Sequence, residues 1–171
     1  MILTVNLVFS TLIFWMLARL YLWPLHRFSP RDVLLPILLL HSFRHLGLMF
    51  LAPGAIYPGM PAQFAIPAAT GDVLAALLAV AAIRAVAAQL RIAKPLVWVF
   101  NIEGTLDLIA AISLATIFDA GPYMGPAYWI PAFWVPALLV THWITFIVLV
   151  RHWPVASDSP RSSSAGAWTA S

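Results

Sequence analysis

Five stretches of the sequence are each long and apolar enough to cross a lipid bilayer as a helix. They cover residues 2–22, 33–51, 68–88, 95–118 and 130–150. A transmembrane helix needs about 20 mainly apolar residues, because each residue advances the helix by about 1.5 Å. The sequence therefore predicts an all-α integral membrane protein in which residues 1–153 form a bundle of five transmembrane helices. The third helix has an alternative start at Phe64, with a bend at Pro67.

The composition supports the membrane class. Of the 171 residues, 63% are hydrophobic and 9% are charged, whereas soluble domains have about 45–50% apolar and about 25% charged residues. The net charge of +3 does not indicate a nucleic-acid partner, because the basic residues are few and lie near the ends of the apolar stretches. The chain has no cysteine, which excludes disulfides, thiolate nucleophiles and metal sites with cysteine ligands.

The basic residues of the connections predict the orientation of the bundle. They lie after the first, third and fifth stretches: Arg27, Arg31, Arg91, Lys94 and Arg151. The connections over 52–70 and 119–128 contain no Lys or Arg. Because cytoplasmic loops carry the excess of Lys and Arg, we expect the N-terminus outside and the C-terminus in the cytoplasm. The expected location is the cell inner (plasma) membrane, with residues 154–171, rich in Ser and Ala, as a disordered cytoplasmic tail.

The second stretch carries three basic side chains near its middle: His41, Arg44 and His45. An ionisable residue at this depth costs a few kcal/mol, so such residues are rare, face the interior and pair with other polar groups. At about 100° per residue, these three positions share one face of an α-helix. The sequence therefore predicts a basic face directed at polar groups of other helices.

Three other stretches contain polar side chains that could pair with this basic face. Glu103 and Asp107 lie four residues apart on one face of the fourth stretch, and Asn101 lies on another face. His142 is near the centre of the fifth stretch, whereas Asp72 is expected in the first turns of the third, near the outer surface. The candidate ligand or proton site comprises His41, Arg44, His45, Asp72, Asn101, Glu103, Asp107 and His142.

The functional hypotheses follow from the charges of these candidate site residues. With neutral histidines, Arg44 faces two or three carboxylates, and an uncompensated charge is unstable in hydrocarbon. Protonated carboxyls, protonated histidines, a bound cation or water from the outer face could each restore the balance. The leading hypothesis is a buried site that binds or relays a proton, an ion or a small ligand near the midplane.

Two further hypotheses remain open at this stage. A metal ion could be held by His41, His45 and His142, or a b-type haem could be bound between His142 and either His41 or His45. Alternatively, the polar set could only fix the register of the helices in a structural or accessory subunit. Beyond the lipid bilayer, the expected partner is a second copy of the chain or another membrane subunit. No catalytic reaction is assigned.

Overall fold

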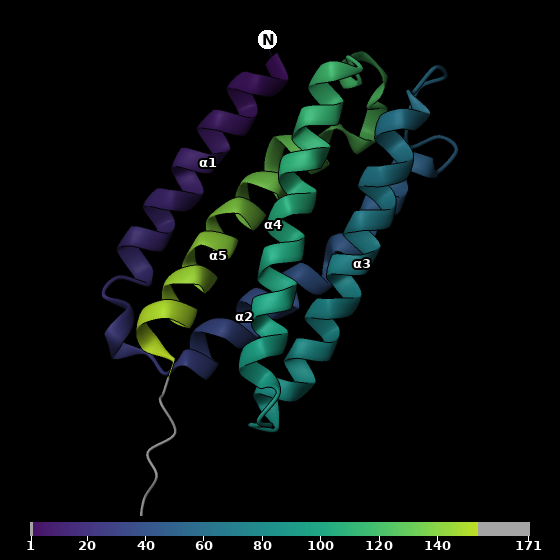
Figure 1. Cartoon of the computed structure of the whole chain (residues 1–171). Coiled ribbons are helices and arrows are strands. Elements are labelled where there is room, and N and C mark those ends of the chain that lie inside the picture. Colours follow the sequence, from purple (N-terminus) through teal and green to yellow (C-terminus); the bar gives the residue numbers. More distant parts are fainter. Residues whose placement is uncertain (1, 154–171) are drawn as a thin grey trace, which may run out of the picture.

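The computed structural model describes residues 2–153, and its regular elements in this range are helices (Figure 1). The α-helices are α1 (Ile2–Tyr21), α2 (Pro30–Ser42), α3 (Ala62–Ala87), α4 (Ala93–Ile117) and α5 (Val135–Ile147). Short 3₁₀ segments are η1 (Leu25–Arg27), η2 (Phe43–Leu51), η3 (Gly121–Tyr123) and η4 (Gly125–Tyr128), and π-helical turns are η5 (Ile130–Trp134) and η6 (Val148–His152).

Five helical rods in this range are long and apolar enough to span a membrane. Two of them combine several segments: α2 continues into η2, and η4, η5, α5 and η6 form one rod. The predictions of an all-helical chain and of five helices with this length and composition are confirmed. The third helix begins at Ala62, six residues before the predicted boundary, and Pro67 lies inside it. Residues 154–171, predicted as a tail, lie outside the described residues.

The core forms around α3, which packs against α2, η2 and α4 (Figure 1). Its buried face is built largely of alanine, for example Ala69, Ala75, Ala79 and Ala82. Small side chains allow helix backbones to approach closely where no large hydrophobic side chains interdigitate. This close approach brings polar side chains of three helices within hydrogen-bonding range.

The rod of α2 changes its winding after Ser42. α2 ends there, and the next nine residues of η2 form a 3₁₀ helix. A 3₁₀ helix advances about 120° per residue, so residues three apart lie directly above one another. The faces predicted for a continuous α-helix therefore do not persist beyond His41.

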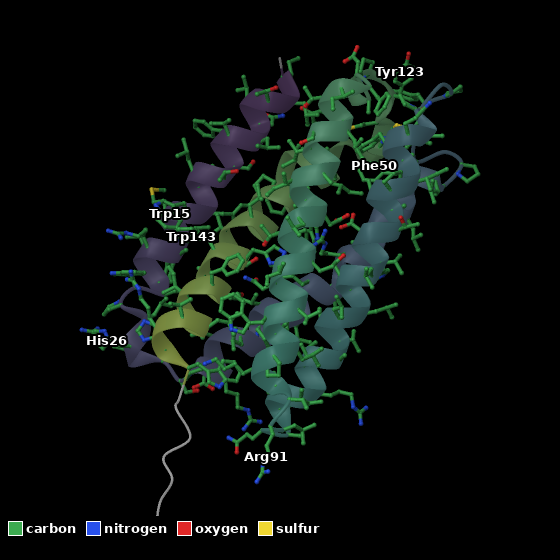
Figure 2. All side chains as sticks on the ribbon, in the orientation of Figure 1. Trp15, His26, Phe50, Arg91, Tyr123 and Trp143 are labelled. Atoms are coloured by element: carbon green, nitrogen blue, oxygen red, sulfur yellow. The ribbon has the colours of Figure 1, made fainter. Side chains whose placement is uncertain are left out.

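The two ends of the bundle differ in charge and in structure. At one end, the connections over 52–61 and 118–129 pair, because Tyr57 N donates to Tyr123 O at 2.8 Å and Ala127 N donates to Ala55 O at 2.9 Å. We call this pair of connections the cap. At the opposite end lie all the Lys and Arg residues of the described chain except Arg44. Figure 2 shows Arg91 and His26 at this basic end and Tyr123 at the cap.

α1 is a peripheral helix. It packs on α5 and η5 (Figure 1), and none of its residues is buried. One polar contact fixes its cap end, where Asn6 Nδ2 donates to the Tyr128 hydroxyl at 2.8 Å. The polar centre of the bundle is consequently built without α1.

Candidate functional site

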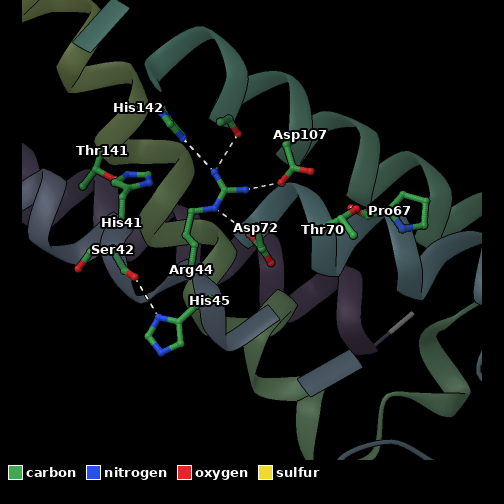
Figure 3. Close-up of polar contacts among 11 residues, drawn as sticks. His41, Ser42, Arg44, His45, Pro67, Thr70, Asp72, Asp107, Thr141 and His142 are labelled. Carbon is green, nitrogen blue, oxygen red and sulfur yellow. Dashed lines mark hydrogen bonds and ion pairs between the residues drawn. The ribbon is translucent and has the colours of Figure 1, made fainter. Parts of the chain in front are cut away.

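A group of polar side chains lies at the centre of the bundle, where α2, η2, α3, α4 and α5 meet (Figure 3). We call this group the Arg44 cluster. It consists of His41, Arg44, Asp72, Asn101, Asp107, Thr141 and His142. Five of these side chains belong to buried residues, and Asp107 and Thr141 are half-buried. The cluster is therefore largely shielded from solvent.

Arg44 connects three elements through its guanidinium. Nε donates to Asp72 Oδ1 at 2.7 Å, and the NH2 nitrogen donates to Asp107 Oδ2. The NH1 nitrogen donates to the backbone carbonyl of Gly104 at 3.1 Å. The Arg44 side chain is 0% exposed, while the carboxylate side chains of Asp72 and Asp107 are 12% and 13% exposed. One guanidinium thus bridges two carboxylates from different helices, which its planar fork of donors allows.

His142 is held in one orientation by Asn101. Asn101 Nδ2 donates to the His142 carbonyl at 3.3 Å, which turns the Asn101 Oδ1 atom toward His142 Nδ1 at 2.7 Å. His142 Nδ1 is therefore the donor of that bond. In a neutral ring the lone pair is then on Nε2, which lies 3.5 Å from the Arg44 NH1 nitrogen. Asn101 thus selects the tautomer that accepts from the guanidinium.

His41 is oriented by Thr141. The Thr141 hydroxyl donates to the Ala137 carbonyl at 2.8 Å, so it accepts from His41 Nε2 at 2.9 Å. His41 Nδ1 is buried and has no hydrogen-bond partner among residues 2–153. The His41 and His142 rings lie against each other, with centroids 4.3 Å apart, and both contact Phe100. Two oriented imidazoles thus form one wall of the cluster.

Three glycines make the space that the charged side chains occupy. A Cβ at Gly104 would lie 2.7 Å from the His142 ring and 2.8 Å from Arg44 NH1. A Cβ at Gly47 would meet Asp72, and one at Gly71 would meet Asp107. Each glycine therefore permits a close approach that any larger residue would obstruct.

The position of Asp72 corrects the sequence-based expectation. A helix starting at residue 68 places Asp72 in its first turns, near the outer surface. Because α3 begins at Ala62, Asp72 lies ten residues into the helix, about 15 Å along its axis. Asp72 therefore reaches Arg44, and it is a second aspartate of the site together with Asp107.

The position of His45 is a second correction. His45 is exposed, and its Nδ1 donates to the Ser42 carbonyl at 3.0 Å, so the ring points away from Arg44 (Figure 3). Where α2 passes into the 3₁₀ helix η2, Arg44 is directed to the interior like His41, whereas His45 is turned by about 120° from Arg44. The predicted common face of His41, Arg44 and His45 therefore exists only for the first two.

This placement separates the three histidines proposed as metal ligands. Within residues 2–153, no group of three or more histidine, aspartate or glutamate side chains is arranged to hold a metal ion. The pair of His41 and His142 does not fit a haem either. An iron bound between His41 and His142 requires a porphyrin between the rings, but these rings touch each other.

Glu103 lies beside the cluster without an ionic partner among the described residues. It is half-buried, and its Oε2 atom is buried without a hydrogen-bond partner in residues 2–153. It precedes Asp107 by four residues, so the two carboxyl groups are neighbours on α4. Glu103 does not pair with Arg44, because Arg44 donates to Asp72 and Asp107 instead.

A small cavity of about 40 Å³ lies between Asp72 and the cap. Phe50, Phe64 and Met124 are among the residues that line it, and Asp72 is its acidic lining residue. The volume suffices for one or a few water molecules. Asp72 thus faces the cap side of the bundle.

Sequence reasoning missed two parts of the site. Thr141 is adjacent to His142 in the sequence and is not among the candidate site residues, although it orients His41. Gly71 precedes Asp72 and makes space for Asp107, a carboxylate of another helix. Adjacency to a predicted site residue was the available signal in both cases, but the contacts depend on helix packing.

Comparisons with known proteins give one match. The family model described as domain of unknown function (DUF8737) matches residues 2–150. The search of curated proteins and the search of solved structures each returned no match.

Proposed function

The chain belongs to this family, whose description names no activity, and we propose that it is a membrane protein whose Arg44 cluster binds an exchangeable proton or a small cation. In this proposal the five rods span the cell inner membrane. The basic end is cytoplasmic, because Lys and Arg concentrate on that side of membrane proteins. The N-terminus and the cap are then outside, and the cluster lies near the midplane.

The single observation that carries the proposal is the charge of the cluster. Arg44 donates to two aspartates, and Glu103 lies one turn from one of them. If all three carboxyl groups were ionised, two negative charges would remain in an apolar region. Such an excess is not stable in hydrocarbon, so the site must take up protons or a cation.

The arrangement also supports exchange with the outer side. Asp72 lines the small cavity below the cap, and its side chain keeps 12% of its surface exposed. Asp107 is bridged to Asp72 by Arg44, so a change of charge at one aspartate alters the hydrogen bonds of the other. A proton or cation entering from the cap would therefore meet Asp72 first, and the change of charge there would alter the hydrogen bond that Arg44 donates to Asp107.

Infrared difference spectroscopy of the purified protein at two pH values tests this proposal. We expect a carboxylic C=O band that changes with pH and that is reduced or shifted in Asp107→Asn. Asp119→Asn is the matched control, because Asp119 is an exposed acid near the cap. Repeating the titration with sodium, potassium or lithium distinguishes a proton site from a cation site, since a bound cation competes with protonation.

Two outcomes would contradict the proposal. One is a pH difference spectrum that is the same in the wild type, in Asp107→Asn and in Glu103→Gln. The other is a set of cluster variants that lose only thermal stability and no titrating band. The second outcome would assign the cluster to the structural role considered from the sequence.

A further inference from the structure

A cavity at the basic end lies away from the Arg44 cluster. Its volume is about 510 Å³, and it is formed where the start of α2, the end of α3 and the start of α4 meet. The side chain of Trp153, at the end of the described chain, closes one side. None of the cluster residues lines this cavity.

Apolar and polar residues line different parts of the cavity. The deep part is apolar and includes Leu34, Val86 and Ala93, which are all buried. The mouth is polar and includes Ser29, Arg31, Asp32 and Gln89. A cavity of this kind suits an amphipathic molecule with a polar head at the mouth and a hydrocarbon chain inside.

The polar mouth carries two opposite charges. Arg31 and Asp32 are both exposed, and neither forms an ion pair within residues 2–153. The Asp32 carboxylate accepts from the Ser29 hydroxyl at 2.7 Å through Oδ2, so Oδ1 is left for a ligand. Ser29 also caps α2, because Asp32 N donates to its hydroxyl at 3.2 Å. The mouth therefore offers a guanidinium and a carboxylate side by side.

We propose that this cavity binds a phospholipid with a zwitterionic ethanolamine headgroup. The phosphate lies against the Arg31 guanidinium, which favours a negative group. The primary ammonium donates to the Asp32 carboxylate, and an acyl chain lies along Leu34 and Val86. Because Arg31 and Asp32 cancel in charge, the mouth favours a zwitterion over an anionic headgroup. The position at the basic end is where headgroups lie in the proposed membrane orientation.

Native mass spectrometry of the detergent-purified protein tests this inference with phosphatidylethanolamine, phosphatidylcholine and phosphatidylglycerol of identical acyl chains. We expect phosphatidylethanolamine to bind about tenfold more tightly than the other two. Asp32→Asn should remove the preference for ethanolamine over choline, while keeping the backbone cap made by Ser29. Arg31→Gln should weaken all three lipids. Arg27→Gln, an exposed arginine at the same end that does not line the cavity, is the control and should change none.

Three results would overturn the inference. Equal binding of all three lipids would mean that the cavity does not distinguish their headgroups. Tightest binding of phosphatidylglycerol, with equal losses in Arg31→Gln and Arg27→Gln, would indicate general attraction to the basic end. Equally tight binding of water-soluble phosphoethanolamine would assign the mouth to a soluble ligand. The wild-type comparison of lipids needs no variant, so it holds even if Arg31→Gln fails to fold. It is also independent of the pH titration of the Arg44 cluster.

Discussion

Arg44 is the residue on which the interior of the bundle depends. Its side chain is fully buried and donates to groups of α3 and α4 while facing His142 of α5. The geometry is specific to arginine, because a lysine ammonium is a compact charge that cannot span two carboxylates and a carbonyl in one plane. Removing the guanidinium would leave two carboxylates without their cationic partner.

Arg44→Met is expected to reduce the free energy of unfolding by about 3–5 kcal/mol, since breaking a buried ion pair leaves an uncompensated charge. Denaturation in mixed micelles measures the loss. Adding Asp72→Asn and Asp107→Asn to Arg44→Met should recover most of it, because the unpaired charges are then gone. A triple variant as unstable as the single one would show that the ion pairs are not the cause.

Gly104→Ala should be destabilising by about 1–3 kcal/mol, because its Cβ would lie 2.7 Å from the His142 ring and 2.8 Å from Arg44. Gly121→Ala is a matched control, since a Cβ there meets nothing within 4 Å. Thermal unfolding of both variants measures the difference. Equal transition temperatures would mean that the cluster accommodates the added methyl group without a loss of stability.

At the scale of the elements, the winding of the second rod decides which side chains enter the site. α2 ends at Ser42 and η2 continues to Leu51 as a 3₁₀ helix. This change directs Arg44 to the interior like His41 and turns His45 to the surface. Histidines four residues apart in the sequence therefore have different environments.

Alanine substitution of the histidines tests this winding. His41→Ala and His142→Ala should each cost about 1–3 kcal/mol, because they remove the hydrogen bonds that the two rings make with Thr141 and Asn101. His45→Ala should change the free energy of unfolding by less than about 0.5 kcal/mol, because its ring is exposed. A loss for His45→Ala as large as that for His41→Ala would indicate a continuous α-helix through this region.

At the scale of the whole molecule, the basic end and the cap give the bundle a polarity along its axis. Arg91 and Tyr123 mark its two ends in Figure 2. The chain contains no cysteine, so single-cysteine variants can be labelled without background. The proposed orientation is therefore directly testable in intact cells.

Tyr57→Cys, in the exposed part of the cap, should react with a membrane-impermeant maleimide added outside intact cells. Lys94→Cys, at the basic end, should react only after the cells are opened. The reason is that connections rich in Lys and Arg remain in the cytoplasm. The reverse pattern would contradict the orientation and place the cavity below the cap on the cytoplasmic side.

Access from the cap to the cluster can be measured in the same way. Ala111 lines the small cavity that Asp72 faces, whereas its neighbour Ala110 lies on the exposed face of α4. If the cavity is the route from the cap to Asp72, Ala111→Cys should react with silver ions added outside, and Ala110→Cys should react much more slowly because it faces hydrocarbon. Equal rates would remove the cavity as the route to Asp72.

Much of this architecture follows from the sequence because hydrophobicity and length act locally. Five apolar stretches are enough to predict five helices. The described bounds lie within three residues of that prediction, except that α3 and the fifth rod begin six and five residues earlier than predicted. The local sequence also identifies which residues are costly to bury, so Arg44, Asp107 and His142 could be named as candidates. A buried ionisable group requires a polar partner in any packing of the helices.

The tertiary structure determines which side chains pair with Arg44. Asp72 joins Arg44 because α3 starts early and its alanine face packs closely, and neither depends on residues next to Asp72 alone. His45 is excluded because η2 winds as a 3₁₀ helix, which the hydrophobic pattern does not distinguish from an α-helix. The sequence by itself determined the helices and the charges to be neutralised, since these depend on local composition. Which charges neutralise each other depends on the packing of four separate helices, which no single stretch encodes.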